Sequence, residues 1–500
     1  MPILATPAEP FAADRTADEA AVAELATAFA AQRSGFAADR APSIEARRER
    51  LEALIAMMAA NRARIAEACA ADFGSHPQGA SDLIEVLGVI GRATYALERL
   101  EAWMAPSERH MNPDVFGTAR AEVRWQPKGV VGNIVPWNFP FDLSVGPMVD
   151  MLAAGNRVMV KPSEYTPACA ELLREMVTAA FDPTLVYVAV GEVELARAFS
   201  ATPFDHLLYT GSPEVGRKVM AAAARNLTPV TMELGGKCPA ILTPGSVTSR
   251  NVESIIGTKM VKNGQMCVSV DYCLVPRADL DRFSELATAY MQASTPGYSG
   301  TDDCTGIISV RHLDRLEGML AEAAERQARI VPLDDGSVDR ETRRMPISLV
   351  LDPAPDLRVM QEEIFGPILP VVPYDDLDAA VASINASERP LGLYVFGDDV
   401  AVTDRVLGAT HSGGAAVNTC AVQSALPSMG FGGSGMSGFG RHHGIEGFRE
   451  FSNPRGVVVR GEGDLVDAFY APYAKAVALV DAALGGDRDA REGAPTGGVK

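Results

Sequence analysis

Residues 121–135 read AEVRWQPKGVVGNIV, and this stretch holds the change of pattern that decides the fold. In its first six residues apolar and polar side chains alternate, so that Ala121, Val123 and Trp125 share one side of the expected strand. Residues 130–135 are instead almost continuously apolar, which indicates a strand buried on both faces. A two-faced strand is therefore followed directly by a core strand.

Further short apolar runs follow, separated by segments that are compatible with helices. One set covers residues 158–160, 186–190, 207–209 and 239–242; a second, after an expected helix at 252–261, covers 272–275, 307–310, 347–351 and 415–418. Strands that alternate with helices predict a doubly wound, parallel α/β sheet. Two such sets predict two α/β domains of similar size.

The residues before this region have helical periodicity. Leu51 and Leu54 fall on one apolar face, and Leu83 and Leu87 fall on another. These segments are expected to be helices that cover the sheets. The last residues, from Gly485 to Lys500, are rich in Gly, Asp and Arg and are expected to form a frayed tail.

Composition excludes several classes of protein. The chain has 500 residues and a formal charge of −19, so it offers little to a nucleic-acid backbone or an anionic membrane. Its seven cysteines lack CxxC spacing and its seven histidines lack metal-ligand spacing, which argues against a disulfide framework and a metal site. Reduced thiols predict a cytoplasmic protein. The start of the sequence does not resemble a signal peptide, and no uncharged apolar run reaches membrane-spanning length.

Two residues have side chains suited to covalent chemistry. Cys267 lies in the loop sequence KNGQMCV at 262–268, where a thiol could act as a nucleophile; the alternative is a buried cysteine that only packs. Glu233 ends a strand-like run before a glycine pair in TMELGGK at 231–237, where a ligand could approach the backbone closely; the alternative is a solvated carboxylate.

Two loops could bind anions. In PWNFP at 136–140, prolines bracket Asn138 and hold its amide rigidly, as an oxyanion donor requires; the alternative is an asparagine that stabilises its own loop. In TGSPEVG at 210–216, Pro213 is suited to the first turn of a helix whose N–H groups could hold a pyrophosphate. No complete GxGxxG motif accompanies it, so this signal is weak alone.

Taken together, these motifs resemble the NAD(P)-dependent aldehyde dehydrogenase superfamily over about residues 20–465. The match also includes KPSE at 161–164, EEIFGP at 362–367, Asn418-Thr419 and GFGGSGMSGFGRHHG at 430–444. A short connection at 190–194 and a long C-terminal segment are most similar to the class-3 and coniferyl-aldehyde branch. Cys420 and the segment Ser269 to Tyr272 depart from the family pattern and weaken any inference about the substrate.

The resemblance implies a catalytic mechanism. Cys267 would attack the aldehyde carbonyl to form a thiohemiacetal, and the Asn138 amide with the Cys267 backbone N–H would hold the oxyanion. After hydride transfer, Glu233 would activate the water that hydrolyses the thioester to the carboxylic acid. No metal is needed.

The resemblance also implies a cofactor site. Lys161 and Glu164 would contact the adenosine ribose, Ser212 the pyrophosphate, and Glu363, beside Phe365, the nicotinamide ribose. A carboxylate on the 2′-hydroxyl favours NAD, and Lys161 leaves NADP tolerated. The remaining expected cofactor residues are Pro136, Trp137, Ser163, Gly211 and Leu234.

The resemblance predicts a domain organisation as well. Residues 15–114 and 128–233 would form a Rossmann-like cofactor domain, 234–451 a catalytic domain, 115–127 and 452–462 a β oligomerisation arm, and 463–500 an extension and tail. The arm would dock on a second subunit, which predicts a homodimer; the alternative is a ribbon within one monomer. Two other functions remain open: a CoA-acylating or phosphorylating dehydrogenase, and a catalytically silent binding protein.

Overall fold

The computed structural model describes residues 15–485, and the chain divides into two compact units. The first contains residues up to Trp103 together with Pro127–Ser452, and the second contains Met104–Gln126 together with the residues from Asn453. Within the described range, no helix is both long and apolar enough to cross a membrane. The predicted tail from residue 486 and the first 14 residues lie outside the described residues.

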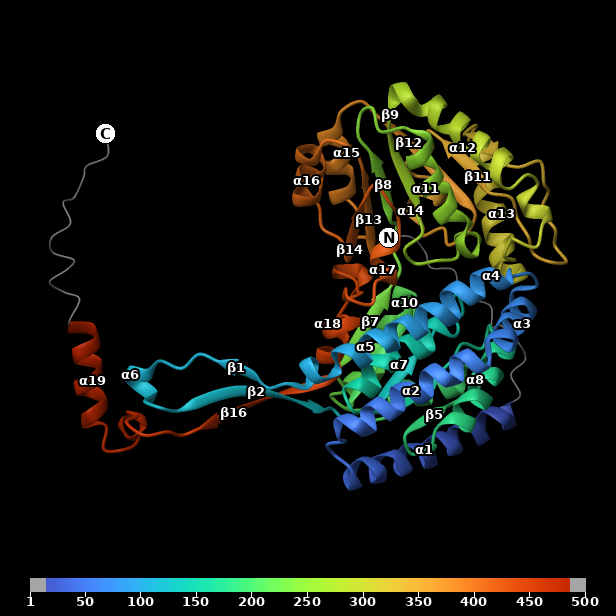
Figure 1. The fold of residues 1–500 in the computed structure, drawn as a ribbon. Coiled ribbons are helices and arrows are strands. Elements are labelled where there is room, and N and C mark those ends of the chain that lie inside the picture. Colours follow the sequence, from blue (N-terminus) through green and yellow to red (C-terminus); the bar gives the residue numbers. More distant parts are fainter. Residues whose placement is uncertain (1–14, 486–500) are drawn as a thin grey trace, which may run out of the picture. The chain divides into compact units, whose positions relative to one another are not determined.

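One sheet of the first unit has six strands in the order β15-β7-β6-β3-β4-β5. Its strands β7 and β5 are labelled in Figure 1. These strands pair in parallel, except that β15 runs antiparallel to β7. Their bounds are β3 Val130–Ile134, β4 Arg157–Lys161, β5 Val186–Val188, β6 His206–Gly211, β7 Val230–Leu234 and β15 Gly438–Phe439. All of β3 is buried, as its apolar sequence predicts for a central strand.

Helices connect and cover these strands. The connecting helices are α7 Asp142–Ala153, α8 Pro167–Ala180, α9 Val193–Ala201 and α10 Pro213–Ala224. The N-terminal helices are α1 Arg15–Ala38, α2 Ile44–Ala60, α3 Arg62–Phe73, α4 Gln78–Ala80 and α5 Val89–Met104, with a π-helix, η1, at Ser81–Gly88. The sequence-predicted cover helices are thus present.

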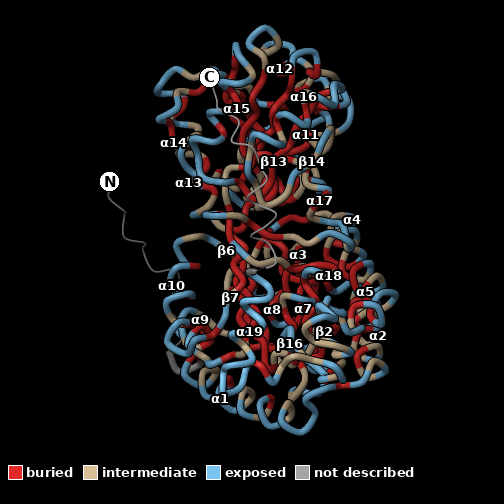
Figure 2. The backbone as a smooth tube through the Cα atoms, turned by 90° about the vertical axis from the view of Figure 1, so that its left-hand side faces the viewer, coloured by how far each residue is buried: buried red, intermediate tan, exposed pale blue. Residues whose placement is uncertain are grey.

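The other sheet of the first unit has seven strands in the order β10-β11-β12-β9-β8-β13-β14, parallel except for β10. Its strands are β8 Pro239–Leu242, β9 Tyr272–Pro276, β10 Arg329–Pro332, β11 Ser348–Leu351, β12 Ile368–Tyr374, β13 Gly392–Phe396 and β14 Gly414–Val417. Its main helices are α11 Ser249–Met260, α12 Leu280–Ser294, α13 Val310–Glu325, α15 Leu377–Asn385 and α16 Val400–Ala409. Figure 2 shows the buried backbone that runs through both sheets. The predicted fold class, two doubly wound α/β sheets, is confirmed.

The second unit contains a three-stranded sheet, β1-β2-β16. Its elements are β1 Ser107–Arg109, α6 Pro113–Phe116, β2 Arg120–Pro127, β16 Ser452–Val459, η6 Val466–Phe469 and α19 Ala474–Gly485. The alternating residues from Ala121 to Gln126 do form a strand. The segment after β16 returns to the turn around α6, where the Leu465 N–H donates to the Val115 carbonyl at 2.8 Å.

Three local predictions were wrong. The run at 239–242, grouped with the first set of strands, forms β8 of the other sheet, where it pairs with β9 and β13. Residues 307–310 form no strand: Ile307 and Ile308 are buried in an irregular segment, and Ser309 caps the helix α13. Leu83 and Leu87 do not face a buried interior but are 63% and 57% exposed. They lie in the π-helix η1, whose i→i+5 hydrogen bonds change the periodicity on which the prediction depended.

Candidate active site

The predicted site residues come together in a cavity of about 240 Å³ in the first unit. Its lining contains every predicted residue except Lys161, Ser163 and Glu164. It comprises Pro136, Trp137, Asn138, Gly211, Ser212, Glu233, Leu234, Cys267, Glu363 and Phe365, together with His312, Arg315, Phe431 and others that were not predicted. Segments more than 200 positions apart in sequence therefore meet at one place.

Cys267 follows a tight left-handed turn. Helix α11 ends at Met260, and Lys262 and Asn263 then have φ values of 50° and 53°, which are costly for residues other than glycine. The Lys262 ammonium pairs with the Glu85 carboxylate at 2.8 Å, and both side chains are fully buried. The Asn263 amide donates to the Met345 carbonyl at 3.0 Å. These contacts fix the turn. Cys267, which follows it, is half-buried, whereas the other six cysteines are buried.

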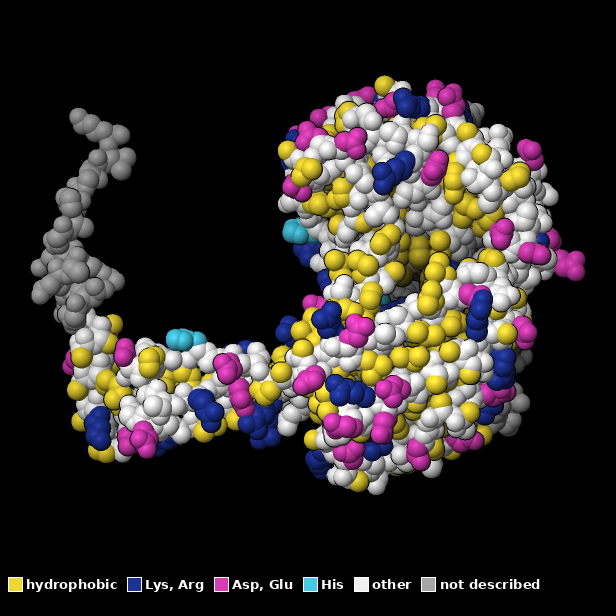
Figure 3. Space-filling view, in the orientation of Figure 1, with side chains coloured by type: hydrophobic (Ala, Val, Ile, Leu, Met, Phe, Trp, Pro, Cys, Tyr) yellow, Lys and Arg dark blue, Asp and Glu magenta, His cyan; other side chains and the backbone are white. Residues whose placement is uncertain are grey.

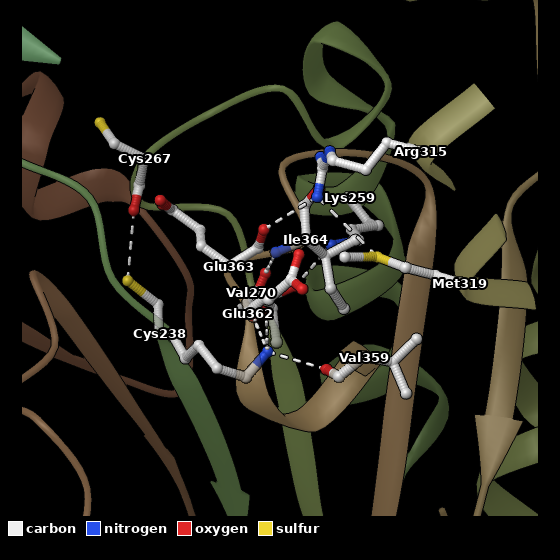
Figure 4. Close-up of polar contacts among 12 residues, drawn as sticks. Cys238, Lys259, Cys267, Val270, Arg315, Met319, Val359, Glu362, Glu363 and Ile364 are labelled. Carbon is white, nitrogen blue, oxygen red and sulfur yellow. Dashed lines mark hydrogen bonds and ion pairs between the residues drawn. The ribbon is translucent and has the colours of Figure 1, made fainter. Parts of the chain in front are cut away.

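The Cys267 thiol lies close to carboxylates. Burial raises its pKa to about 12, and the neighbouring Glu363 and Glu233 add to the increase. Figure 4 shows the Glu363 side chain extending toward Cys267, and the Cys238 thiol donating to the Cys267 carbonyl at 3.3 Å. The thiol is therefore protonated at neutral pH in the protein without ligands, and its use as a nucleophile requires a proton acceptor.

Glu233 is a buried carboxylate at the end of strand β7. Its side chain is 2% exposed, and neither carboxylate oxygen has a hydrogen-bond partner in the described structure. Burial raises its pKa well above the ordinary value; Arg441 opposes this increase and Glu450 adds to it. A Cβ at Gly432 would lie only 2.8 Å from the Glu233 Oε1, so the glycine lets the backbone pack against the carboxylate. A buried, unpartnered carboxylate of this kind is suited to accept a proton.

Asn138 is directed at the loop that carries the cysteine. It is buried, and its Nδ2 donates to the Gln265 carbonyl at 3.2 Å. Gln265 is itself fixed, because its side chain donates to Lys262 and Gly306 and accepts from the Ile308 N–H. The second Nδ2 hydrogen of Asn138 remains available for another acceptor. Sequence reasoning missed Gln265, whose role depends on contacts distant in sequence.

A second cavity, of about 530 Å³, adjoins the start of helix α10. Ser212 caps this helix, and Ser212, His312 and Arg315 line both this cavity and the first. Arg311 adds positive charge, whereas Lys218, which also lines the cavity, pairs with Glu214 at 2.9 Å. Cationic side chains beside a helix N-terminus fit the pyrophosphate of a dinucleotide. The α13 residues were not predicted, although Arg311 and Arg315 lie four positions apart on one helix and share a face.

Glycine and aromatic residues shape the space between these charges and Cys267. A Cβ at Gly235 would lie 2.1 Å from the Glu363 Oε2, so only glycine leaves room for this carboxylate. The Trp137 and Phe365 rings meet edge to face, with centroids 5.2 Å apart. Lys161 and Glu164, which line neither cavity, pair with each other at 2.8 Å. The residues present thus fit a dinucleotide cofactor.

A third cavity, of about 600 Å³, lies on the other side of the thiol. Cys267, Leu143 and Phe431 line both this cavity and the first, so the thiol stands between the two. The larger cavity is mostly apolar, and the exposed Leu83 and Leu87 of η1 are among its lining residues. Figure 3 shows hydrophobic side chains around a hollow on this face of the first unit. An apolar organic molecule can therefore approach the sulfur from the side opposite the first cavity.

Comparison with known proteins identifies the class. Residues 9–457 match the model of the aldehyde dehydrogenase family, and the chain belongs to that family. Its activity is therefore the NAD(P)-dependent oxidation of an aldehyde. The resemblance predicted from the motifs, including the branch with coniferyl aldehyde dehydrogenases and family-3 enzymes, is confirmed.

Individual relatives cover nearly the whole chain. A probable coniferyl aldehyde dehydrogenase of Caulobacter vibrioides is 43% identical over 87% of this chain and 90% of its own length. A substrate-bound structure of Staphylococcus aureus AldH has a TM-score of 0.87 at 30% identity and covers 92% of this chain and 99% of that one. The Mycobacterium tuberculosis aldehyde dehydrogenase complexed with NAD+ has a TM-score of 0.77 at 27% identity, covering 88% and 90%.

Proposed function

We propose that this protein oxidises an aromatic aldehyde similar to coniferyl aldehyde to its carboxylic acid, through a covalent intermediate on Cys267. The observation that carries this proposal is the position of Cys267 between the first cavity, which contains Glu233 and Asn138 and shares Ser212, His312 and Arg315 with the cation-lined cavity, and the apolar cavity. The name of the Caulobacter relative supports the aromatic substrate. Phe139 and Phe431 in the apolar cavity support it as well, because aromatic rings pack favourably on one another.

The first steps belong to Cys267 and Asn138. The sulfur adds to the carbonyl carbon as its proton leaves for a neighbouring carboxylate, which gives a thiohemiacetal. The Asn138 side-chain N–H and the Cys267 backbone N–H then stabilise the oxygen anion, whose charge exists only after attack. The nicotinamide of the cofactor, when bound, supplies the hydride acceptor that converts this adduct into a thioester.

Glu233 completes the reaction. Its burial and raised pKa make the carboxylate a proton acceptor for a water molecule that attacks the thioester carbonyl. The carbon–sulfur bond breaks, the carboxylic acid leaves, and the thiol is restored. The comparisons favour neither acyl transfer to CoA nor a silent homologue.

We further propose how the chain holds its cofactor. Ser212 and the start of α10, with Lys218 and Arg311, would bind the pyrophosphate, and Glu363 beside Phe365 would bind the nicotinamide ribose. The Lys161–Glu164 pair would face the adenosine ribose, with NAD preferred and NADP tolerated. The six-stranded sheet with its helices would then be the cofactor domain, and the seven-stranded sheet the catalytic domain.

A homodimer built through the second unit completes the proposal. Val458 of β16 is 67% exposed, and α19 exposes Val477, Val480 and Leu484 along one face. Apolar residues that their own chain leaves uncovered support an arm that docks on a second subunit. All seven cysteines are free thiols, which supports a cytoplasmic location.

A panel of aldehydes tests the proposed activity. Purified protein is mixed with NAD and aromatic, medium-chain aliphatic or lignin-derived aldehydes, and reduced nicotinamide is followed by absorbance while the acid is quantified. The proposal predicts one acid per reduced cofactor without CoA or phosphate, and no turnover by Cys267→Ala, which still binds NAD. Retention of a tenth of the turnover by this variant, or formation of product only with CoA, contradicts the proposal.

A further inference from the structure

The apolar cavity beside Cys267 contains polar groups that have no partner. His442 lines the cavity and is fully buried, yet neither of its ring nitrogens makes a hydrogen bond within the described residues. Buried polar atoms of this kind are rare, and each is costly unless something satisfies it. The proposed mechanism does not use this residue.

The backbone fixes the His442 ring in place. The Phe431 N–H donates to the His442 carbonyl at 2.7 Å, and the His442 N–H donates back to Phe431 at 2.9 Å. The ring then meets Phe431 edge to face at 5.3 Å and the His443 ring at 4.3 Å. Phe431 lines both the apolar cavity and the first cavity, and Cys267 lies between the two. His442, which packs against Phe431, therefore lies in the wall of the cavity through which a substrate reaches the sulfur.

The His442 ring is neutral. Burial, Arg92 and Arg441 lower its pKa to about 3, so at neutral pH one nitrogen donates a hydrogen bond and the other accepts one. Among the described residues, the charged side chains that line this cavity with it are Arg92 and Asp142, and they compensate each other as an ion pair. The His443 Nε2 is occupied by Arg92 and its backbone N–H by Asp150, whereas its Nδ1 has no hydrogen-bond partner within the described residues. The part of the apolar cavity next to His442, the His442 subsite, is thus polar but has no net charge.

We propose that His442 binds the hydroxyl group of a hydroxylated aromatic aldehyde, and that it gives this enzyme a preference for such substrates over those without the hydroxyl. The inference rests on the proposed function, because the ligand is the aldehyde that reacts at Cys267. A neutral imidazole both donates to and accepts from a hydroxyl. A carboxylate or ammonium on the substrate finds no free counter-charge here and is disfavoured.

Substrate pairs that differ by one hydroxyl provide the kinetic test. We compare kcat/KM for 4-hydroxycinnamaldehyde and cinnamaldehyde with NAD, in wild type and in His442→Phe, which keeps an aromatic ring without nitrogens. Wild type should prefer the hydroxylated aldehyde roughly 10- to 100-fold. His442→Phe should abolish that preference and leave cinnamaldehyde within about threefold of wild type. His442→Gln, which restores a donor and an acceptor, should regain part of it.

Binding measurements keep the inference separate from the proposed activity. Calorimetry compares 4-hydroxycinnamamide with cinnamamide, unreactive analogues of the two aldehydes, on the wild-type protein. Tighter binding of the hydroxylated amide by wild type, lost in His442→Phe, supports the subsite even if no aldehyde is oxidised. Equal affinity of wild type for both amides overturns it, as does an equal loss of activity toward both aldehydes in His442→Phe.

Discussion

The protonation state of Cys267 can be measured directly. Burial and the neighbouring carboxylates raise the pKa of this thiol from 9.0 to about 12. At any pH below 9, three pKa units make the thiolate about a thousandfold scarcer than in an unperturbed thiol. A thiolate of higher pKa is also more nucleophilic, by roughly 20-fold over three units. Reaction with an aromatic disulfide reagent should therefore be about 50-fold slower than for a free cysteine.

Replacement of Glu363 by glutamine tests the electrostatic cause. Burial, with Asp271 adding to it, raises the pKa of Glu363 to about 7, so its carboxylate is mostly neutral at pH 6 and mostly ionised at pH 8. Its negative charge opposes thiolate formation only in the ionised state. The variant should therefore react like wild type at pH 6 and up to about threefold faster at pH 8, because a fall of about one pKa unit makes the thiolate about tenfold more abundant and about threefold less nucleophilic.

The assay follows modification of the Cys267 peptide by mass spectrometry between pH 6 and 10, in the protein without cofactor. Cys267→Ala is the control that separates this site from the six buried cysteines. In Glu363→Gln the logarithm of the rate should rise by one unit per pH unit and not level off by pH 10. In wild type it should rise less steeply between pH 6 and 8, where Glu363 ionises, and by one unit per pH unit above that range. Restricted access of the reagent to the thiol would lower the rate at every pH, but it would not change the pH at which the rate levels off. A plateau near pH 9 in wild type would refute the reasoning.

Three further predictions concern the parts that hold and support the site. Asn138→Ala should lower kcat at least about 100-fold with little change in NAD binding, because one oxyanion donor is lost; a loss of only a few-fold would make Asn138 a loop support. Glu85→Gln should lower the free energy of unfolding by about 3–5 kcal/mol, because it leaves Lys262 buried and uncompensated; this is measured by denaturant unfolding, and a change under about 1 kcal/mol would show that the pair is relaxed or hydrated. Light scattering should give about twice the 53.0 kDa chain mass, and a stable, active monomer would contradict the proposed arm.

Residues that end core strands could be located from the sequence. Glu233 follows a strand-like run, and the PWNFP loop follows the buried strand β3, so their place at the carboxyl ends of parallel strands follows from the fold class. The cavity accordingly contains nearly every residue that the motifs indicated. Local pattern located these residues, and the resemblance to a known family selected them as site residues over the alternatives that the pattern left open.

Contacts between distant segments could not be predicted. The pair of Glu85 and Lys262 joins residues 177 positions apart, and the left-handed turn that it supports has no glycine at its first two positions. The exposure of Leu83 and Leu87 depends on a π-helix, which a 3.6-residue periodicity cannot reveal. Ile307 has the apolar character of a strand residue but is a buried anchor in a loop. In each case, packing rather than local preference decides the structure.

Trapping the acyl-enzyme tests the central claim that Cys267 forms a thioester which Glu233 then helps to hydrolyse. Glu233→Gln is mixed with NAD and cinnamaldehyde, quenched in acid, and examined by intact and peptide mass spectrometry while reduced nicotinamide is followed by absorbance. The account predicts a burst of about one reduced cofactor per active site and a cinnamoyl group on the Cys267 peptide. Loss of turnover with no acyl group on Cys267, or an acyl group on another residue, would contradict it.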